Sequence, residues 1–224
     1  MTFRLSPANH RHLQLIIGLV EEAALWLRGK GTDQWERPWP SRAKRDARIL
    51  RDLWARRTWI AWENGVPAAT ITADETANPM LWTGWERAEA ATYVHRLVVA
   101  RKYAGRGLGA DLLDWAGNRA AKHYGAQWIR IDVWTTNTPL HRYYEAQGFK
   151  FVRYCSDPEY PSGALFQKAT DQIAESDNHV LEEVPERILV PNGRQRIHMP
   201  NARSHEQQNG CRYTVRAELF NRSS

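Results

Sequence analysis

Three glycines, Gly105, Gly107 and Gly109, fall within the stretch LVVARKYAGRGLGADLLDW, between an apolar run and an apolar-periodic run that begins at Leu108. The first backbone N–H groups of a helix have no acceptor within the helix, and the helix dipole favours an anion beside them. Glycines in the preceding loop let these donors close around a phosphate without interference from Cβ atoms. The glycines alone are equally compatible with a tight strand-to-helix turn that requires positive φ angles.

Two well-known phosphate-binding loops do not match this stretch. The dinucleotide fingerprint requires G-x-G-x-x-G, whereas the glycines here are spaced G-x-G-x-G. The Walker loop requires G-x-x-x-x-G-K-[ST], and no such run occurs in the sequence. ATP, GTP and NAD(P) are therefore disfavoured as ligands.

The elements around the loop follow an α/β pattern. An apolar strand before the glycines, a helix after them and a second strand predict a right-handed crossover between two central strands of a mixed sheet. Asn64-Gly65 between two β-rich runs predicts a hairpin. Along the chain we expect helices over 6–28 and 43–57, the hairpin over 58–74, a strand over 91–100, a helix over 108–124, a strand over 128–136, a short helix over 139–147, and strands over 149–155 and 163–169.

Two stretches carry a resemblance to a known family. LVVARKYAGRGLGADLL resembles motif A of the GNAT superfamily of acetyl-CoA-dependent N-acyltransferases, in which a strand leads into [QR]-x-x-G-x-[GA] at the start of a helix. NTPLHRYYEAQGF, residues 137–149, is similar to the family's N-x-x-A-x-x-[LF]-Y-x-x-x-G-F. Their order and separation are more specific than either motif alone. The resemblance covers about residues 58–169 and implies a domain over 1–169 with the family's fold, a central mixed, mostly antiparallel β-sheet flanked by helices.

The resemblance also implies how acetyl-CoA, the acyl donor, would bind. The backbones of Leu97, Val98 and Val99 would pair with the pantetheine arm as an added strand would, and Asn137 would hydrogen-bond the pantetheine region. Tyr144 would lie near the thioester sulfur and protonate the leaving thiolate, a role that suits a phenol with an unperturbed pKa near 10. The residues that would surround the pyrophosphate are Ala104, Gly105, Arg106, Gly107, Leu108, Gly109 and Ala110.

Two positions depart from the family pattern. Ala104 stands where Gln or Arg is usual, and Leu140 stands where a small residue is common. The side chain of Arg106 could supply the missing charge, or it could be a solvated loop arginine. The backbone donors survive both changes, so we expect weaker donor affinity with the same reaction type and no metal.

Acyl transfer to an amine requires a group that takes the amine's proton. His95, two residues before Leu97, is our first candidate, since histidine has an unperturbed pKa near 6.5. The arylalkylamine acetyltransferases resemble this chain in having a histidine at that strand position; a structural histidine is the alternative. Asp132 and Glu63 are weaker candidates that also suit surface or salt-bridge positions.

Three neighbours of Tyr144 receive other interpretations. His141 and Arg142 are expected to line the cofactor side or to face solvent. Adjacent tyrosines on a helix point in different directions, so Tyr143 is expected to pack while Tyr144 faces the thiol.

The acceptor would be bound by the first two helices, the loop GTDQWERPWPSR and the segment NPMLWTGWE. Their tryptophans could wall an aromatic or apolar pocket, or they could cap the core. Nearby carboxylates could bind a polycationic amine, although their spacing does not force a cluster. The tryptophans are Trp35, Trp39, Trp82 and Trp85, and the carboxylates are Asp33, Glu36, Asp74 and Glu75.

Composition limits the remaining classes. The length of 224 residues suits one large domain or one domain with an appendage, and a content of 42% hydrophobic and 25% charged residues is typical of a soluble globular protein. The net charge is +6, and the basic residues are scattered between carboxylates rather than grouped. This pattern favours an anionic small molecule over nucleic acid as the ligand. The apolar run from Leu13 ends at Glu21, and no stretch reaches the roughly 18 apolar residues of a membrane span, so we expect neither a signal peptide nor membrane insertion. Cys155 and Cys211 match no metal or redox spacing, so we expect a cytoplasmic protein.

The sequence changes character after Ala169. Residues 170–224 are rich in polar and acidic residues and are expected to form a C-terminal extension of unknown role, in which Asn192-Gly193 could form a hairpin turn. The extension could bind a partner or cover a site in a homodimer. For the whole chain we expect acetyl transfer from acetyl-CoA to a primary amine of a small molecule or peptide, by direct attack in a ternary complex. The alternative is a non-catalytic acyl-CoA-binding module.

Overall fold

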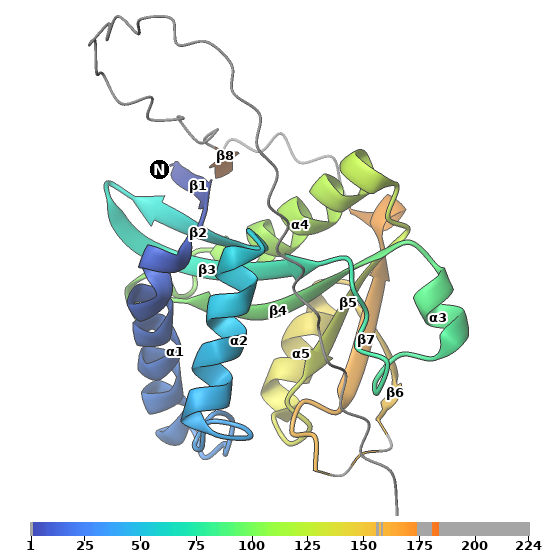
Figure 1. Cartoon of the computed structure of the whole chain (residues 1–224), viewed down its shortest axis with the longest axis horizontal. Helices are drawn as coiled ribbons and strands as arrows, with labels where there is room; N and C mark the ends of the chain where they lie inside the picture. The colour runs from blue at the N-terminus through green and yellow to red at the C-terminus, as the bar shows by residue number, and fades with distance from the viewer. Residues whose placement is uncertain (1, 156, 158, 174–180, 184–224) are drawn as a thin grey trace, which may run out of the picture. The chain divides into compact units, whose positions relative to one another are not determined.

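The computed structural model describes residues 2–155, 157, 159–173 and 181–183 (Figure 1). Most of the expected extension, including Asn192-Gly193, lies outside these residues, so its role and its boundary at 169 stay predictions. The elements are β1 Phe3–Pro7, α1 Leu13–Arg28, α2 Arg42–Trp54, β2 Thr58–Glu63, β3 Val66–Asp74, α3 Gly84–Ala88, β4 Ala91–Val99, α4 Leu108–Tyr124, β5 Trp128–Val133, α5 Thr138–Ala146, β6 Lys150–Tyr154, β7 Ala164–Ala169 and β8 Leu181–Glu183.

The strands form one eight-stranded sheet in the order β6-β7-β5-β4-β3-β2-β1-β8. Only the β4–β5 and β1–β8 pairs are parallel among the described strands. The prediction of a mixed, mostly antiparallel sheet flanked by helices is therefore confirmed. The parallel β4–β5 pair requires a crossover, and α4 supplies it.

Helices cover both faces of the sheet (Figure 1). Neighbouring residues of β2 show this, because side chains alternate between the two faces along a strand. Ile60 packs with Ile16 of α1 and Leu53 of α2. The ring of Trp59 lies edge-on to Trp115 of α4, with centroids 5.0 Å apart. The first two helices and the crossover helix therefore lie on opposite faces.

The prediction of a helix from Ser6-Pro7 is wrong at its start. Residues 3–7 form β1, which pairs antiparallel with β2, and α1 begins only at Leu13. Phe3 and Leu5 are buried while Arg4 is exposed, a period of two that is typical of a strand. The second helix ends at Trp54, because Arg56 has a left-handed φ of 56°.

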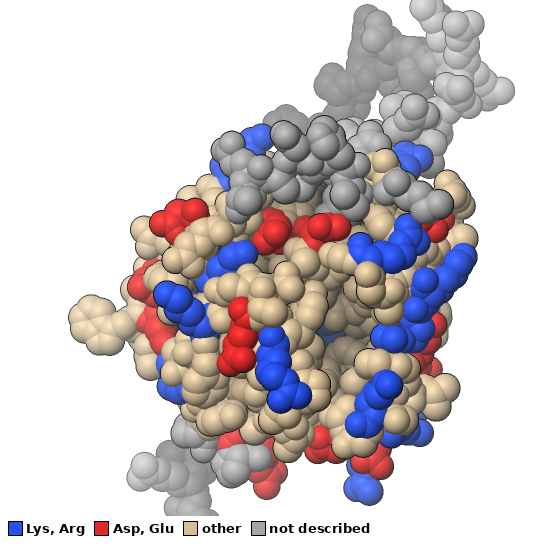
Figure 2. Space-filling model, turned by 180° about the vertical axis from the view of Figure 1, so that it is seen from behind, with Lys and Arg blue, Asp and Glu red and all other residues tan. Residues whose placement is uncertain are grey.

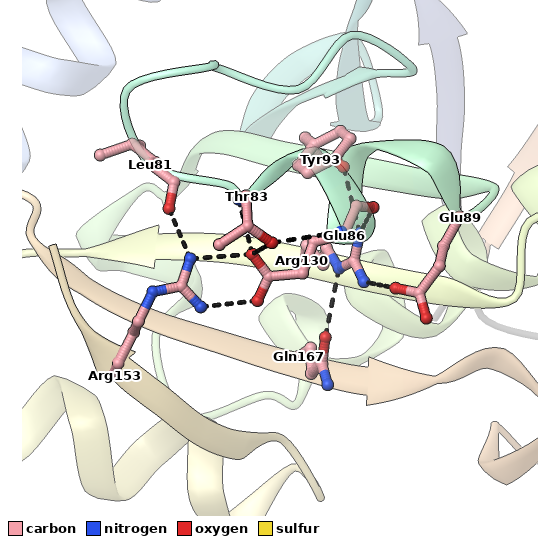
Figure 3. A network of polar contacts seen from close by, with 8 residues as sticks. All are labelled: Leu81, Thr83, Glu86, Glu89, Tyr93, Arg130, Arg153 and Gln167. Atoms are coloured by element: carbon pink, nitrogen blue, oxygen red, sulfur yellow. Dashed lines mark hydrogen bonds and ion pairs between the residues drawn. The ribbon is translucent and has the colours of Figure 1, made fainter.

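The sequence does not predict the short helix α3, and two arginines from strands of the sheet hold it in place (Figure 3). Arg130 of β5 is fully buried and pairs with Glu89, while its guanidinium lies 5.0 Å from the ring centroid of Trp82. Arg153 of β6 binds the Glu86 carboxylate at 2.6 and 2.8 Å. The further acceptors are the carbonyls of Leu81 and Glu86, the Tyr93 hydroxyl and Oε1 of Gln167.

Candidate active site

A cavity of about 1730 Å³ lies between α1, α2, β4, β5 and α5, and the loop at the start of α4 opens onto it. Its lining includes nine Lys or Arg residues and six Asp or Glu residues, so it carries a positive excess. Figure 2 shows both acidic and basic side chains on the face of the molecule that is seen from behind.

The central strand presents an open edge to this cavity. The parallel pairing of β4 with β5 runs from Ala91 to Val94 and stops there. Beyond it, β3 is the one described strand that pairs with β4, through His95, Val98 and Val99. Leu97, Val98 and Val99 all line the cavity. An open strand edge offers backbone N–H and C=O groups to an extended ligand.

The structure gives a physical reason for glycine at each of the three positions in the loop. Gly105 and Gly107 both have φ of +78°, a left-handed conformation that side chains disfavour, and an added Cβ would meet no atom within 4 Å. Gly109 instead allows a close approach, because an added Cβ would lie 2.7 Å from the Tyr143 hydroxyl. The loop is therefore a tight turn that also leaves open space beside its backbone.

The start of α4 supplies free donors at the same place. The first helical bonds are donated by Ala110 and Asp111 to the Gly107 carbonyl at 2.9 and 3.1 Å. The N–H groups of Leu108 and Gly109 precede them and have no acceptor within the helix. Ala104, Gly105 and every residue from Gly107 to Ala110 line the cavity, so an anion there would meet the positive end of the helix dipole.

The side chain of Arg106 lies elsewhere. Its guanidinium contacts Glu63 at 2.7 Å and lies over the rings of Phe3 and Tyr103, and Arg106 does not line the cavity. The idea that this side chain supplies the charge missing at Ala104 is therefore not supported. The Arg106 hydrogen bond lowers the pKa of Glu63, which also lies outside the cavity. The lowered pKa and the position outside the cavity both argue against Glu63 as the general base.

His95 and Asp132 lie together on the cavity wall. Nδ1 of His95 is 3.2 Å from Oδ1 of Asp132, whose side chain is 9% exposed. Oδ2 of Asp132 accepts a hydrogen bond from the Tyr160 hydroxyl at 2.9 Å. Asp132 is thus no surface residue: it holds the His95 ring through Nδ1 and leaves Nε2 as the nitrogen that can take a proton. Such a carboxylate–histidine pair is the usual arrangement of an oriented base.

Tyr144 and Tyr143 of α5 both line the cavity. Tyr144 is buried, and burial raises the pKa of its phenol well above the usual value near 10, with smaller contributions from Tyr143 and Asp132. The phenol therefore stays protonated and can act as a donor. Tyr143 packs against Gly109, as its close approach to that residue requires.

Asn137 joins α5 to the loop before α2. Its Oδ1 accepts a hydrogen bond from the Leu140 N–H at 3.1 Å and caps the helix, while its Nδ2 donates to Oε1 of Gln34 at 2.5 Å. Asn137 and Gln34 are both buried and both line the cavity. The sequence gives no indication of the Gln34 contact, which links residues 103 positions apart.

The expectation for His141 is wrong. Its ring is buried beside Phe166, and its Nε2 lies 2.8 Å from the Trp134 carbonyl, so it neither lines the cavity nor faces solvent. The buried residues of α5 are His141 and Tyr144, which lie three positions apart and therefore on the same face of the helix. Arg142 is exposed, in agreement with the alternative of a solvent position.

The structure separates the candidate acceptor residues into two groups. Trp35 and Trp39 line the cavity, whereas Trp82 lies in the buried arginine network and Trp85 is exposed. Among the carboxylates, Glu36 and Asp74 line the cavity and Glu75 does not. Asp33 accepts hydrogen bonds from Trp134 and Thr136 instead. Sequence reasoning missed several lining residues that have no motif of their own, namely Tyr160, Gln34, Arg48, Asp52 and Arg96.

Neither of two other features is found in the part of the chain that the structure describes. Its helices include none that is long and apolar enough to cross a membrane. Within the same residues, no three His, Cys, Asp or Glu side chains are grouped so as to hold a metal ion.

Comparisons with known proteins agree with this geometry. The model of the acetyltransferase (GNAT) family matches residues 25–149, which include β4, the glycine loop and all of α5. An uncharacterized N-acetyltransferase of Bacillus subtilis, YesJ, is 30% identical over 154 residues, covering 67% of this chain and 83% of YesJ.

Two solved structures share the fold. The PaiA N-acetyltransferase of Thermoplasma acidophilum, in complex with coenzyme A, has a TM-score of 0.56 at 18% identity and covers 75% of this chain and 99% of its own. YncA of Salmonella typhimurium, a putative acetyltransferase with acetyl-CoA, has a TM-score of 0.54 at 17% identity and covers 79% and 99%.

Proposed function

Because the chain belongs to the GNAT family of acetyltransferases, we propose that it transfers an acetyl group from acetyl-CoA to a primary amine, by direct attack in a ternary complex. One observation carries the proposal: an open strand edge, a helix start with free N–H groups, an oriented histidine and a protonated tyrosine line the same cavity.

The chain's residues fit the donor in three places. The β4 edge at Leu97, Val98 and Val99 would pair with the amide groups of the pantetheine arm. The N–H groups of Gly105, Gly107, Leu108 and Gly109 would bind the pyrophosphate, for which Ala104 offers no side-chain charge. Asn137 keeps one amide hydrogen beyond its bond to Gln34, and this hydrogen would serve the pantetheine region. The fold relatives bound to coenzyme A or acetyl-CoA support this assignment.

The reaction forms a C–N bond to the acetyl carbon and breaks the thioester C–S bond. His95 would take the amine's proton at Nε2, while Asp132 at Nδ1 stabilises the imidazolium that results. Tyr144 would donate to the sulfur as negative charge develops on it. Because burial raises the pKa of this phenol, and a thiol is the stronger acid, hydrogen-bond donation is favoured over complete proton transfer.

The test is release of free thiol from acetyl-CoA with a panel of primary amines, alongside calorimetry of coenzyme A binding. We expect thiol release that depends on the amine and saturates with it. Tyr144→Phe should lower turnover by about 10²-fold or more with little loss of acetyl-CoA affinity, whereas Tyr154→Phe, at an exposed tyrosine, should change neither. Tight binding of coenzyme A without thiol release from any amine would instead support a non-catalytic acyl-CoA-binding module.

A further inference from the structure

The acceptor side of the cavity carries a local excess of positive charge. Arg48, Arg51 and Arg96 line it together with a single buried carboxylate among them, Asp52. Asp52 is already shared, because it contacts Arg51 at 3.4 Å and also pairs with Arg96. Nearby, Arg57 is matched by Asp74 at 2.6 Å. The excess therefore concentrates on Arg48.

Arg48 has no carboxylate partner within the described residues. One of its amino groups donates to the Trp39 carbonyl at 2.6 Å, and its guanidinium lies 5.3 Å from the centroid of the Trp39 ring. These contacts hold the half-buried side chain in place but supply no negative charge. Burial lowers the pKa of Arg48; Arg96 and Arg51 lower it further, while Tyr160 and Asp52 oppose them. A bound anion would relieve this repulsion.

Arg48 is connected to the candidate base. The Trp39 ring packs edge-on against Tyr160, with centroids 5.1 Å apart, and the Tyr160 hydroxyl donates to Asp132, the carboxylate beside His95. All five side chains line one cavity. A ligand whose amine reached His95 would therefore extend past the Tyr160 ring toward Arg48.

We propose that the acceptor is an amine that also bears a carboxylate, an amino acid or a similar compound, and that Arg48 binds this carboxylate. The inference rests on the proposed acetyl transfer for the identity of the amine, but not for the binding of the carboxylate. Asp52 contacts both Arg51 and Arg96, which leaves Arg48 as the guanidinium of this group without a carboxylate contact among the described residues, and a carboxylate would supply its counter-charge. With one amino group donating to the Trp39 carbonyl, the remaining N–H donors of the planar fork suit a carboxylate.

The test measures binding separately from turnover. Calorimetry in the presence of coenzyme A compares N-acetylglycine, N-acetyl-β-alanine and N-acetylphenylalanine with their carboxamides and with the phosphonate analogue of N-acetylglycine. We expect at least one acid to bind about 10- to 100-fold more tightly than its carboxamide. Arg48→Gln should abolish that difference, Arg48→Lys should restore part of it, and Arg51→Gln, on the same helix, should preserve it. Coenzyme A affinity, unchanged in all three, shows that the variants are folded.

Three results would overturn the inference: no acid binds, acids and carboxamides bind equally, or the phosphonate binds best. A loss of the acid preference in Arg51→Gln as large as in Arg48→Gln would also count against Arg48. Thiol release with the free amino acids and their amides then separates the two proposals. Acid-selective binding without any turnover refutes acetyl transfer alone, whereas turnover without acid selectivity refutes the carboxylate site alone.

Discussion

The close approach of α4 and α5 at Gly109 can be tested by a double-mutant cycle with Tyr143. In Gly109→Ala the new Cβ would lie 2.7 Å from the Tyr143 hydroxyl, well inside the ordinary contact distances that begin near 3.4 Å. In Tyr143→Phe this oxygen is gone, and the nearest atoms are the ring carbon Cζ and Cγ2 of Val99, both at 3.7 Å. The same methyl group is thus overpacked in one background and accommodated in the other.

The magnitude follows from two opposing contributions. Overpacking costs about 1–3 kcal/mol, while replacing glycine by alanine inside a helix contributes about 0.5–1 kcal/mol of stability. We expect Gly109→Ala to destabilise the parent protein by about 1–2 kcal/mol. In the Tyr143→Phe background the same substitution should be neutral or stabilising by about 0.5 kcal/mol. The coupling between the two sites is therefore about 1–2.5 kcal/mol.

Urea unfolding of the four proteins measures this coupling, and calorimetry of coenzyme A binding measures its effect on the cavity. Gly109→Ala should weaken binding, because relief of the clash displaces α5 from the start of α4, and Tyr143→Phe should restore the affinity. Equal costs of Gly109→Ala in both backgrounds would refute the close approach as the reason for glycine at this position.

Three further predictions concern the loop, the base and the buried network. Gly107→Val should abolish measurable coenzyme A binding. The control is Gly125→Val, which imposes similar left-handed strain, at φ +69°, at the other end of α4; it should lower stability but keep coenzyme A binding. Calorimetry measures binding and melting curves measure stability for both variants. His95→Ala should lower kcat/KM by about 10²- to 10⁴-fold and remove the acidic limb of the pH–rate profile; a limb that persists unchanged would exclude His95 as the base. Arg153 is the main reason that the pKa of Glu86 falls to about 2 from its usual 4.5, so this carboxylate stabilises the fold above pH 4.5 and loses that effect as pH falls toward 2. Glu86→Gln should therefore flatten the fall in stability between pH 5 and 2 by about 1–2 kcal/mol after allowance for partial exposure, as measured by denaturation at each pH.

Local patterns predict most of the elements that position the site. Asn64-Gly65 predicts the β2–β3 hairpin because few residues other than Asn and Gly adopt the left-handed angles of such a turn, and both residues have positive φ. The glycine loop and the periodicity after Leu108 likewise predict the β4–α4 junction, and the helix begins at that residue. These features depend on neighbours in the chain, so the sequence contains the information directly.

Contacts between distant residues explain what the sequence does not reveal. Arg106 lies within the loop that the motif marks, yet its guanidinium is held by Glu63, 43 residues earlier. Trp82 lies in a segment expected from the sequence to bind the acceptor, but its ring instead packs against the buried guanidinium of Arg130, 48 positions later. Neither partner has a spacing that a local pattern could identify. The same holds for Arg48, because only the placement of the neighbouring charges shows that it has no carboxylate partner among the residues that the structure describes.

The candidate base and the open strand edge have a common origin in the sheet. The last paired residues of the two central strands are Val94 and Ile131, and the residues that follow them are His95 and Asp132. Neighbouring positions on parallel strands point to the same face, so these two side chains meet just where the strands begin to separate. Their contact at 3.2 Å crosses the point where the two strands separate. Beyond this point β4 has no partner on that side among the described strands. The separation that would admit the pantetheine arm therefore also puts the candidate base at the inner end of the same cavity, where the proposed reaction requires the thioester carbon.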